Sequence, residues 1–346
     1  MKELSCDAVL VMDELNQHYL SEFAFTDGFL FITEKNAYLV TDFRYYEMAL
    51  KGANKAFEIL MPDDRKEFLN KVIFENGVKT VGFEGGSVSY DVYRRYADGY
   101  PQVEFVNIGD AIEVIRQIKS ADEIAKMQKA QDITDAALSH VLKIMTPNMT
   151  ELDVAVELEY AMRKGGADSF AFETIAVSGD GSALPHGTPR NVKLRPGFLT
   201  MDFGAKYEGY CADMTRTVVI GKADADIKKL YNTVLKAQTE ALAYLKEGAD
   251  CGEADKIARD IIDAVPEFKG AFGHSLGHSV GLFIHESPRL YSRGFGRKLN
   301  VGEILTVEPG IYLFGKYGCR IEDMVAIEKD GIHNFTHSPK DLIEIL

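Results

Sequence analysis

Four carboxylates and three histidines follow one another in short apolar or glycine-containing segments of the second half of the chain. They are Asp202, Asp213, His274, His278, His285, Glu308 and Glu322. A carboxylate in an apolar segment loses hydration, and its pKa shifts unless a cation lies nearby. Few Lys or Arg residues occur in these segments, and a pair of divalent cations would balance the charge instead. The series therefore predicts a metal-dependent enzyme.

The histidines are concentrated. Three of the eight in the chain lie within residues 274–285, in the run HSLGHSVGLFIH. The helical zinc-protease motif needs Glu directly after its first histidine, and Ser275 occupies that position here. Gly277, Gly281 and the run VGLFI favour a strand over a helix. We therefore exclude a helical zinc protease.

Two aspartates, Asp202 and Asp213, lie on opposite arms of an expected hairpin whose turn-rich part is GAKYEG. Two carboxylates that face each other across a hairpin repel unless they share a proton or a cation. The alternative is a pair of ordinary turn or N-cap aspartates. His186 lies upstream in the loop SALPHG, and loops of this composition bring side chains to a cleft or leave them solvated.

The last two acids lie in strand-like runs, Glu308 in LTVEPGIYL and Glu322 in GCRIEDMVAI. Arg320 is two residues from Glu322 and should share its strand face, which leaves an Arg–Glu pair as the non-catalytic alternative. Four carboxylates and one histidine around two divalent ions would set −4 against +4. Oxygen-rich ligands suit Mn²⁺ or Co²⁺, and two such metals activate water and polarise a carbonyl.

The composition limits the class of protein. A chain of 346 residues is too long for one typical core and predicts two domains. The net charge of −14 disfavours a nucleic acid or an anionic membrane as partner. Four dispersed cysteines without a CxxC pair indicate a reduced, cytoplasmic protein. The apolar run near the N-terminus is too short for a signal peptide or membrane helix.

The first part of the chain alternates short β-rich runs with helical stretches, which predicts a small α/β domain. The runs are DAVLVM (7–12), GFLFIT (28–33), AYLVT (37–41), TVGFEG (80–85) and VEFVNI (103–108). A boundary is expected near Lys119–Ser120, where Ser120 and Glu123 form a capping box before a long helix.

The second part contains two similar helix pairs. One has a cap at Thr150 and the other at Asp250, 100 residues later, and strand-like segments with the acids and histidines follow each pair. This predicts an internal duplication, with the site between the two halves.

The ordered motifs resemble the creatinase/aminopeptidase P/prolidase group of metallopeptidases, which have the pita-bread fold. The motifs are SALPHG, MDFGAKYEGYCADMTRT, HSLGHSVGLFIHE, TVEPGIY and RIEDM, with LVTDFRYYE in the first part. The resemblance covers nearly the whole chain. It implies a non-catalytic α/β domain at residues 1–118, similar to the creatinase N-terminal domain. It further implies an α+β pita-bread catalytic domain at residues 119–346, with the pseudo-two-fold duplication.

The resemblance implies a role for each site residue. Its five metal ligands match Asp202, Asp213, His278, Glu308 and Glu322. Asp213 and Glu322 would bridge two ions, manganese in the first place and cobalt or zinc otherwise. Glu308 would also accept a proton from the attacking water. The substrate-binding and proton-shuttling group would comprise His186, His274, His285 and Arg320, with Arg289 facing the substrate. Ser279 departs from the glycine that often follows the ligand histidine.

The implied activity is hydrolysis of Xaa-Pro bonds in dipeptides or at the N-terminus of short peptides, by a hydroxide shared between the metals. A prolidase and an aminopeptidase P both fit, and a homodimer is implied. Methionine aminopeptidase has the same ligand set but usually lacks such an N-terminal domain. A non-catalytic binding protein on this scaffold would be expected to have lost ligands, and this chain has the full set.

Overall fold

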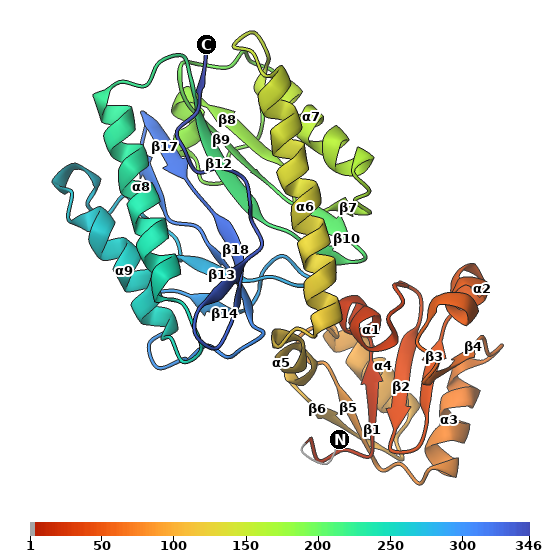
Figure 1. The fold of residues 1–346 in the computed structure, drawn as a ribbon. Helices are drawn as coiled ribbons and strands as arrows, with labels where there is room; N and C mark the ends of the chain where they lie inside the picture. The colour runs from red at the N-terminus through yellow and green to blue at the C-terminus, as the bar shows by residue number, and fades with distance from the viewer. Residues whose placement is uncertain (1–3) are drawn as a thin grey trace. The chain divides into compact units, whose positions relative to one another are not determined.

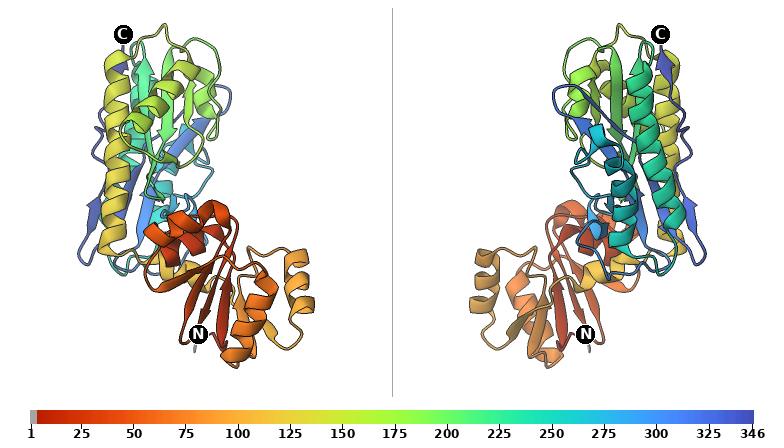
Figure 2. Two further views of the ribbon diagram at one scale, coloured as in Figure 1. Left: turned by 90° about the vertical axis from the view of Figure 1, so that its right-hand side faces the viewer. Right: turned by 90° about the vertical axis from the view of Figure 1, so that its left-hand side faces the viewer.

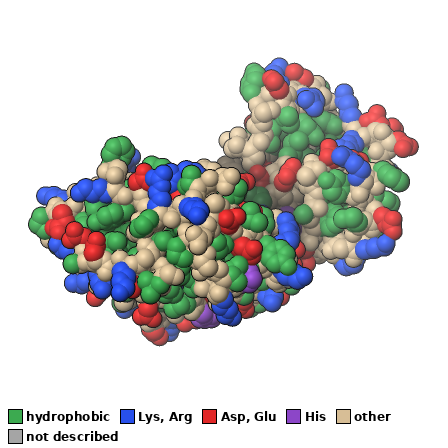
Figure 3. Space-filling model, turned by 90° about the horizontal axis from the view of Figure 1, so that it is seen from above, with side chains coloured by type: hydrophobic (Ala, Val, Ile, Leu, Met, Phe, Trp, Pro, Cys, Tyr) green, Lys and Arg blue, Asp and Glu red, His purple; other side chains and the backbone are tan. Residues whose placement is uncertain are grey.

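The structure, a computed structural model, describes residues 4–346. The chain divides into two compact units, Met1–Arg116 and Gln117–Leu346 (Figure 1). Within the described residues, no helix is both long and apolar enough to cross a membrane. On the face shown in Figure 3, Lys and Arg side chains are interspersed with Asp and Glu, so that face offers no continuous basic stripe to a phosphate backbone.

The first unit is built on a mixed sheet of six strands in the order β4-β3-β2-β1-β5-β6. The strands are β1 (Ala8–Val11), β2 (Phe29–Thr33), β3 (Ala37–Val40), β4 (Phe57–Leu60), β5 (Thr80–Phe83) and β6 (Glu104–Asn107). All five predicted β-rich runs form strands. The sixth, β4, was not predicted, because its four residues at the sheet edge are only partly buried and give a weak apolar signal.

The helices of this part begin at polar caps. They are α1 (Glu14–Ser21), α2 (Phe43–Gly52), α3 (Arg65–Glu75), α4 (Tyr90–Gly99) and α5 (Ala111–Gln117). The side chains of Asp13, Asp42, Asp64 and Ser89 accept hydrogen bonds from the first backbone N–H groups of α1 to α4. Two apolar clusters fill the unit, one with Leu10 and Phe31, the other with Leu30 and Leu39. Because β2 and β3 alternate their side chains, each contributes to both clusters.

The second unit contains two helix pairs, α6 (Ala121–Ile144) with α7 (Glu151–Lys164) and α8 (Ala225–Tyr244) with α9 (Cys251–Asp263). The predicted capping box is present at Ser120–Glu123, and the predicted cap Thr150 forms a second capping box with Asp153. Asp250 caps α9 by accepting from the backbone N–H groups of Gly252 and Glu253. Figures 1 and 2 show α6 and α8 on the same side of the strands.

The strands of the second unit form four sheets. One has the order β20-β12-β9-β8 and another the order β14-β13-β15-β18-β19, while β11-β10-β7 and β16-β17 are smaller. The bounds are β7 (Ser169–Phe170), β8 (Ile175–Ser178), β9 (Gly197–Phe203), β10 (Ala205–Tyr207), β11 (Tyr210–Cys211), β12 (Met214–Ile220), β13 (Gly277–Ser279), β14 (Glu286–Leu290), β15 (Ile304–Val307), β16 (Gly310–Leu313), β17 (Tyr317–Arg320), β18 (Asp323–Ile327), β19 (Ile332–Asn334) and β20 (Glu344–Ile345). Two short 3₁₀ turns, Gly179–Ala183 and Pro266–Phe268, complete the unit.

The predicted duplication is present. The helix pair α6–α7 packs with β9 and β12 in one apolar cluster, and α8–α9 packs with β15 and β18 in another. The two caps correspond even in detail, because Thr150 forms an isolated antiparallel bridge with Lys193 and Asp250 forms one with Lys298. Each half therefore repeats the sequence helix, helix, antiparallel strands.

The strand predicted over the VGLFI run is shorter than expected. Strand β13 ends at Ser279, with a bulge between His278 and Ser279, and residues 281–285 form bends. The VGLFI run is apolar because most of its residues are buried, although it does not continue strand β13. Close packing explains Gly281, since a Cβ atom there would lie 2.6 Å from a carboxylate oxygen of Glu286. The bends carry the chain from His278 round to His285.

Candidate metal centre

All ten residues predicted to form the site line one cavity of about 520 Å³ in the second unit. They are His186, Asp202, Asp213, His274, His278, His285, Arg289, Glu308, Arg320 and Glu322. Apolar side chains, including Phe172, Ile175 and Ile284, form part of the wall. The cavity therefore combines an apolar wall with many convergent ionisable groups, as expected of a site for a polar or charged ligand.

The acids lie at the ends of strands from both halves. Asp202 is the penultimate residue of β9, and Asp213 immediately precedes β12, its antiparallel neighbour. The expected hairpin therefore exists, although residues between its arms form a separate small hairpin, β10–β11. Glu308 follows β15 and Glu322 precedes β18, the corresponding antiparallel pair of the second half. The site thus lies between the halves, as the duplication predicts.

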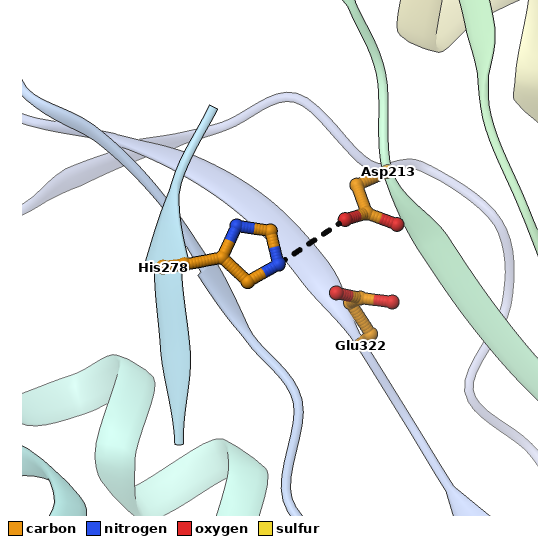
Figure 4. A group of neighbouring side chains, drawn as sticks. All are labelled: Asp213, His278 and Glu322. Carbon is orange, nitrogen blue, oxygen red and sulfur yellow. Dashed lines mark ion pairs between the residues drawn. The ribbon is translucent and has the colours of Figure 1, made fainter. Parts of the chain in front are cut away.

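Three of the side chains that line the cavity form a tight cluster (Figure 4). One ligand atom from each of Asp213, His278 and Glu322 lies within 4.8 Å of the others, and all three residues are buried. Nε2 of His278 is 3.6 Å from Oδ2 of Asp213 and 3.4 Å from Oε1 of Glu308. The distances between these atoms leave room for an ion among them.

The tautomer of His278 is fixed by its backbone partner. Its Nδ1 lies 3.1 Å from the carbonyl oxygen of Ser279, which can only accept, so Nδ1 carries the proton. Burial lowers the pKa of His278 to about 4, and the ring is neutral. The lone pair on its Nε2 is therefore directed at carboxylate oxygens, so acceptor atoms face one another. A cation bound among them would interact favourably with all of them.

The acids carry strongly perturbed pKa values. Burial, reinforced by the neighbouring carboxylates, raises the pKa of Asp213 and of Glu322 well above the usual range. Burial also raises the pKa of Glu308 to about 8. Oδ1 of Asp202 is buried and has no hydrogen-bond partner within residues 4–346. Arg320 supplies one positive charge beside these four carboxyl groups, which leaves most of their charge uncompensated.

Arg320 lies beside these acids and forms an ion pair with Asp202. Its Nη2 donates to Oδ2 of Asp202 at 2.6 Å, and its Nε donates to Oγ1 of Thr215 at 2.9 Å. The Arg320–Glu322 pair, given above as the non-catalytic alternative, does not form, because Glu322 follows the end of β17 and strand alternation no longer applies there. Glu322 is instead held by Thr215, whose hydroxyl donates to its Oε2 at 2.7 Å.

Tyr312 is a residue of this site that the sequence analysis missed. Its hydroxyl accepts from Nη1 of Arg320 at 2.6 Å and lies 2.9 Å from Nε2 of His274. The hydroxyl proton is therefore available to His274, and a chain of hydrogen bonds runs from Asp202 to His274. Gly310 makes this possible, because a Cβ atom there would lie 2.5 Å from the Tyr312 hydroxyl. The motif TVEPGIY contains the tyrosine, but nothing in it distinguishes Tyr312 from a core residue.

The remaining predicted residues surround the cluster. The ring of His285 packs edge-on against that of His278, with centroids 4.6 Å apart, and burial lowers its pKa. Arg289 lies on β14, opposite His278 in the ladder. His186 lines the cavity from the loop after Pro185. Both ring nitrogens of His274 are hydrogen-bonded, Nδ1 to the Ser275 carbonyl at 2.9 Å and Nε2 to the Tyr312 hydroxyl, and these two contacts fix the orientation of the ring.

Comparisons with known proteins agree with this geometry. Residues 125–329 match the model of metallopeptidase family M24, and residues 1–118 match that of the creatinase/prolidase N-terminal domain. The chain belongs to metallopeptidase family M24. It is 37% identical over 345 residues to an Xaa-Pro dipeptidase of Pyrococcus horikoshii, a match covering 99% of this chain and 96% of the relative.

Solved structures of M24-like proteins match over the whole chain. An Xaa-Pro dipeptidase from Bacillus anthracis superposes with a TM-score of 0.94 at 39% identity, covering 99% of this chain and 96% of that one. An X-Pro aminopeptidase from Thermotoga maritima gives a TM-score of 0.94 at 34% identity and covers 99% of each chain. The predicted fold, an α/β domain followed by a duplicated pita-bread domain, is thereby confirmed.

Membership of family M24 implies divalent metal ions, and the donor set of this chain fits them. Three desolvated carboxyls with raised pKa values, an unpartnered oxygen on Asp202 and a neutral histidine with a free Nε2 converge in one place. Oxygen and imidazole donors of this kind suit Mn²⁺, Co²⁺ or Zn²⁺. The described part of the chain thus offers a ready binding site for cations of this class.

Ser279, the departure from the usual glycine, has a partner in the structure. Nζ of the buried Lys119 donates to Oγ of Ser279 and to Oε2 of Glu286, each at 3.2 Å. Ser279 and Glu286 lie on β13 and β14, the strands that flank the histidine-bearing bends. The serine therefore ties the start of the second unit to this hairpin and leaves the donor atoms of His278 unaffected.

The metal-free protein is expected to lose stability as the pH rises from about 6.5 to 8. In this window the unfolded state has ionised carboxylates and neutral histidines, whereas folded Glu308 keeps its proton until about pH 8. The native state therefore binds more protons, and the free energy of unfolding falls by up to about 1.4 kcal/mol per pH unit for each such carboxyl. Urea unfolding of chelator-treated protein across this range measures the slope. Mn²⁺ should flatten it, and a metal-free stability that rises with pH would contradict the electrostatics described here.

Proposed function

We propose that the protein hydrolyses the Xaa-Pro bond of dipeptides or at the N-terminus of short peptides. We propose Asp202, Asp213, His278, Glu308 and Glu322 as ligands of two divalent metal ions. The observation that carries the proposal is the Asp213–His278–Glu322 cluster in a cavity of a family M24 chain. Relatives similar along the whole chain are named Xaa-Pro dipeptidase and X-Pro aminopeptidase.

When bound, the two metals would lower the pKa of water and polarise the scissile carbonyl. The chain's own residues would move the protons. Glu308 would take a proton from the attacking water, a role supported by its position beside the cluster, where its Oε1 lies 3.4 Å from Nε2 of His278. The nitrogen of an Xaa-Pro bond carries no hydrogen, so it must be protonated to leave as the amine of proline. Glu308 would return its proton there as the C–N bond breaks.

Three further groups would act on the substrate. His285 would stabilise the developing oxyanion or transfer a proton, and its position beside His278 supports this role. His274 would act through the hydrogen-bonded chain that includes Tyr312 and Arg320. His186 and the apolar wall would contact the proline ring. Phe172 and Ile175 give that wall its apolar character.

Arg289 would influence whether the enzyme prefers dipeptides or longer peptides. A guanidinium lining the cavity can bind a carboxylate through two parallel hydrogen bonds, and the free carboxylate of a dipeptide would lie one residue beyond the scissile bond. This favours a dipeptidase over an aminopeptidase that acts on longer peptides. A tripeptide would place a peptide bond where the dipeptide has its charge.

Several finer assignments belong to the same proposal. Manganese is the preferred metal because the donor set is rich in carboxylates.

Cys6, Cys251 and Cys319 are buried free thiols, which supports a reducing compartment such as the cytoplasm. The family resemblance supports a homodimer. A domain boundary at residues 118 and 119 is supported by the end of the N-terminal family match at residue 118 and by the contact division after Arg116.

The test compares Ala-Pro, Ala-Ala and Ala-Pro-Ala as substrates, with chelator-treated protein before and after addition of Mn²⁺. We expect hydrolysis of Ala-Pro only after Mn²⁺ is added, at a rate at least about 100-fold above that of Ala-Ala, the scale of discrimination by one or two substrate groups. Ala-Pro-Ala should be the poorer proline substrate. Full activity in verified metal-free protein, or equal rates on Ala-Pro and Ala-Ala, would contradict the proposal.

A further inference from the structure

A buried arginine lies directly behind the proposed ligand Glu322. Arg216 is on β12, one residue from Thr215, and is 2% exposed. A guanidinium has five N–H donors, and five acceptors surround this one. They are the carbonyl oxygens of Pro339 (3.1 Å from Nε), Thr215 (3.0 Å from Nη1), Glu322 (2.5 Å from Nη1) and Ser338 (2.8 Å from Nη2), and Oδ1 of Asp323 (2.8 Å from Nη2).

These contacts hold the backbone of Glu322 on both sides. Its N–H donates to the Thr215 carbonyl at 3.1 Å, and its own carbonyl accepts from Arg216. The Thr215 hydroxyl holds the carboxylate itself. Because Glu322 lies between β17 and β18 and outside either ladder, these contacts from β12 replace the hydrogen bonds that a strand would provide.

The arginine belongs to a charged cluster that also includes the C-terminal segment. Asp323 is fully buried and accepts from Arg216 through Oδ1 and from Nζ of Lys340 through Oδ2, the latter at 2.6 Å. Lys340 also donates to Gln238 at 3.0 Å. Buried ion pairs often stabilise a fold less than well-packed apolar residues of the same size would. A gain in folding stability therefore does not by itself explain why this charged cluster is buried.

We propose that Arg216 is a positioning residue for Glu322, and that it ties residues 338–340 to the metal centre. The inference rests on the proposed role of Glu322 as a metal ligand. Glu322 would have to present both carboxylate oxygens at fixed positions to serve two ions. A side chain attached to an irregular piece of backbone can do so only if that backbone is itself held. Arg216 supplies this restraint with a rigid, planar set of donors that a lysine cannot reproduce.

The test compares Arg216→Lys with a matched control, Arg297→Lys. Arg297 also pairs with a buried carboxylate, that of Glu303, but contacts none of the proposed ligands. Both variants should lower the thermal midpoint. We expect only Arg216→Lys to bind Mn²⁺ more weakly, by about 10- to 100-fold, the usual effect of losing a partner that orients a ligand. Isothermal titration of chelator-treated protein measures this affinity without reference to activity.

A second readout separates positioning from a general loss of structure. At limiting Mn²⁺ the kcat of Arg216→Lys on Ala-Pro should fall, and saturating Mn²⁺ should restore much of it, with KM unchanged because no substrate contact is lost. Unaltered Mn²⁺ affinity in Arg216→Lys would overturn the inference. If that variant does not fold, Asp323→Asn can be used instead, because it weakens the ion pair that holds the Arg216 guanidinium in place. Wild-type Mn²⁺ affinity in Asp323→Asn would equally overturn the inference. A wild-type protein that binds no Mn²⁺ would instead refute the proposed function.

Discussion

Asp213→Asn should abolish metal-dependent activity and at the same time make the metal-free protein more stable. Asp213 is buried beside Glu322 and Asp202, and its pKa is raised by that burial and by their charges. An amide of the same shape removes this repulsion. We therefore expect the metal-free variant at pH 8 to have a higher free energy of unfolding than the wild type.

The loss of activity follows from the proposed bridging role. Replacing a partner that merely orients a ligand costs about 10- to 100-fold, so loss of a ligand to both ions should cost more than about 100-fold in kcat/KM. Mn²⁺ titration and urea unfolding with and without Mn²⁺ measure the two effects. Asp226→Asn, which changes an exposed acid in the first turn of α8, is the control. A variant that keeps wild-type Mn²⁺ affinity, or whose metal-free form is less stable than the wild type, would refute the assignment.

The positions of the proposed ligands could be inferred from the sequence because these acids occur at the ends of apolar runs. Glu308 follows β15 and precedes Pro309, and Asp213 precedes the apolar strand β12. The duplication was predictable for a related reason. The helix caps Thr150 and Asp250 are short local signals, and the structure gives them matching bridges to Lys193 and Lys298. Such local signals can be recognised even where the two halves have low sequence identity.

The contacts around the ligands could not be predicted. Arg320 pairs with Asp202, which lies 118 residues away in the chain, whereas strand alternation points to its neighbour Glu322. The alternation rule fails because the strand ends at Arg320. The role of Tyr312 likewise depends on the pairing of β16 with β17, which sets Gly310 opposite Arg320. Sequence patterns identify elements and their ends, but the partners of a side chain depend on how separate sheets meet.

His285→Ala should lower turnover by about 100-fold or more, the usual scale for a group that transfers a proton, and should leave the metal content unchanged. His285 lies beside His278 but outside the Asp213–His278–Glu322 cluster. Within residues 4–346 its ring forms no hydrogen bond, so both nitrogens remain available to a substrate. The matched control is His140→Ala, which removes a partly exposed histidine paired with Glu157 on the neighbouring helix. Metal analysis of the purified variants, together with kcat on Ala-Pro, separates the two roles.

His285→Asn then distinguishes the two forms of catalysis that the geometry permits. Burial lowers the pKa of His285, so the ring is neutral at pH 7 and can either donate a hydrogen bond to an oxyanion or accept a proton. Asparagine keeps an N–H donor but cannot exchange protons. Recovery of a substantial part of kcat in His285→Asn relative to His285→Ala would assign oxyanion stabilisation, and equal loss in both would assign proton transfer. Loss of a stoichiometric metal in either variant would show that His285 supports the ligand set and does not act on the substrate.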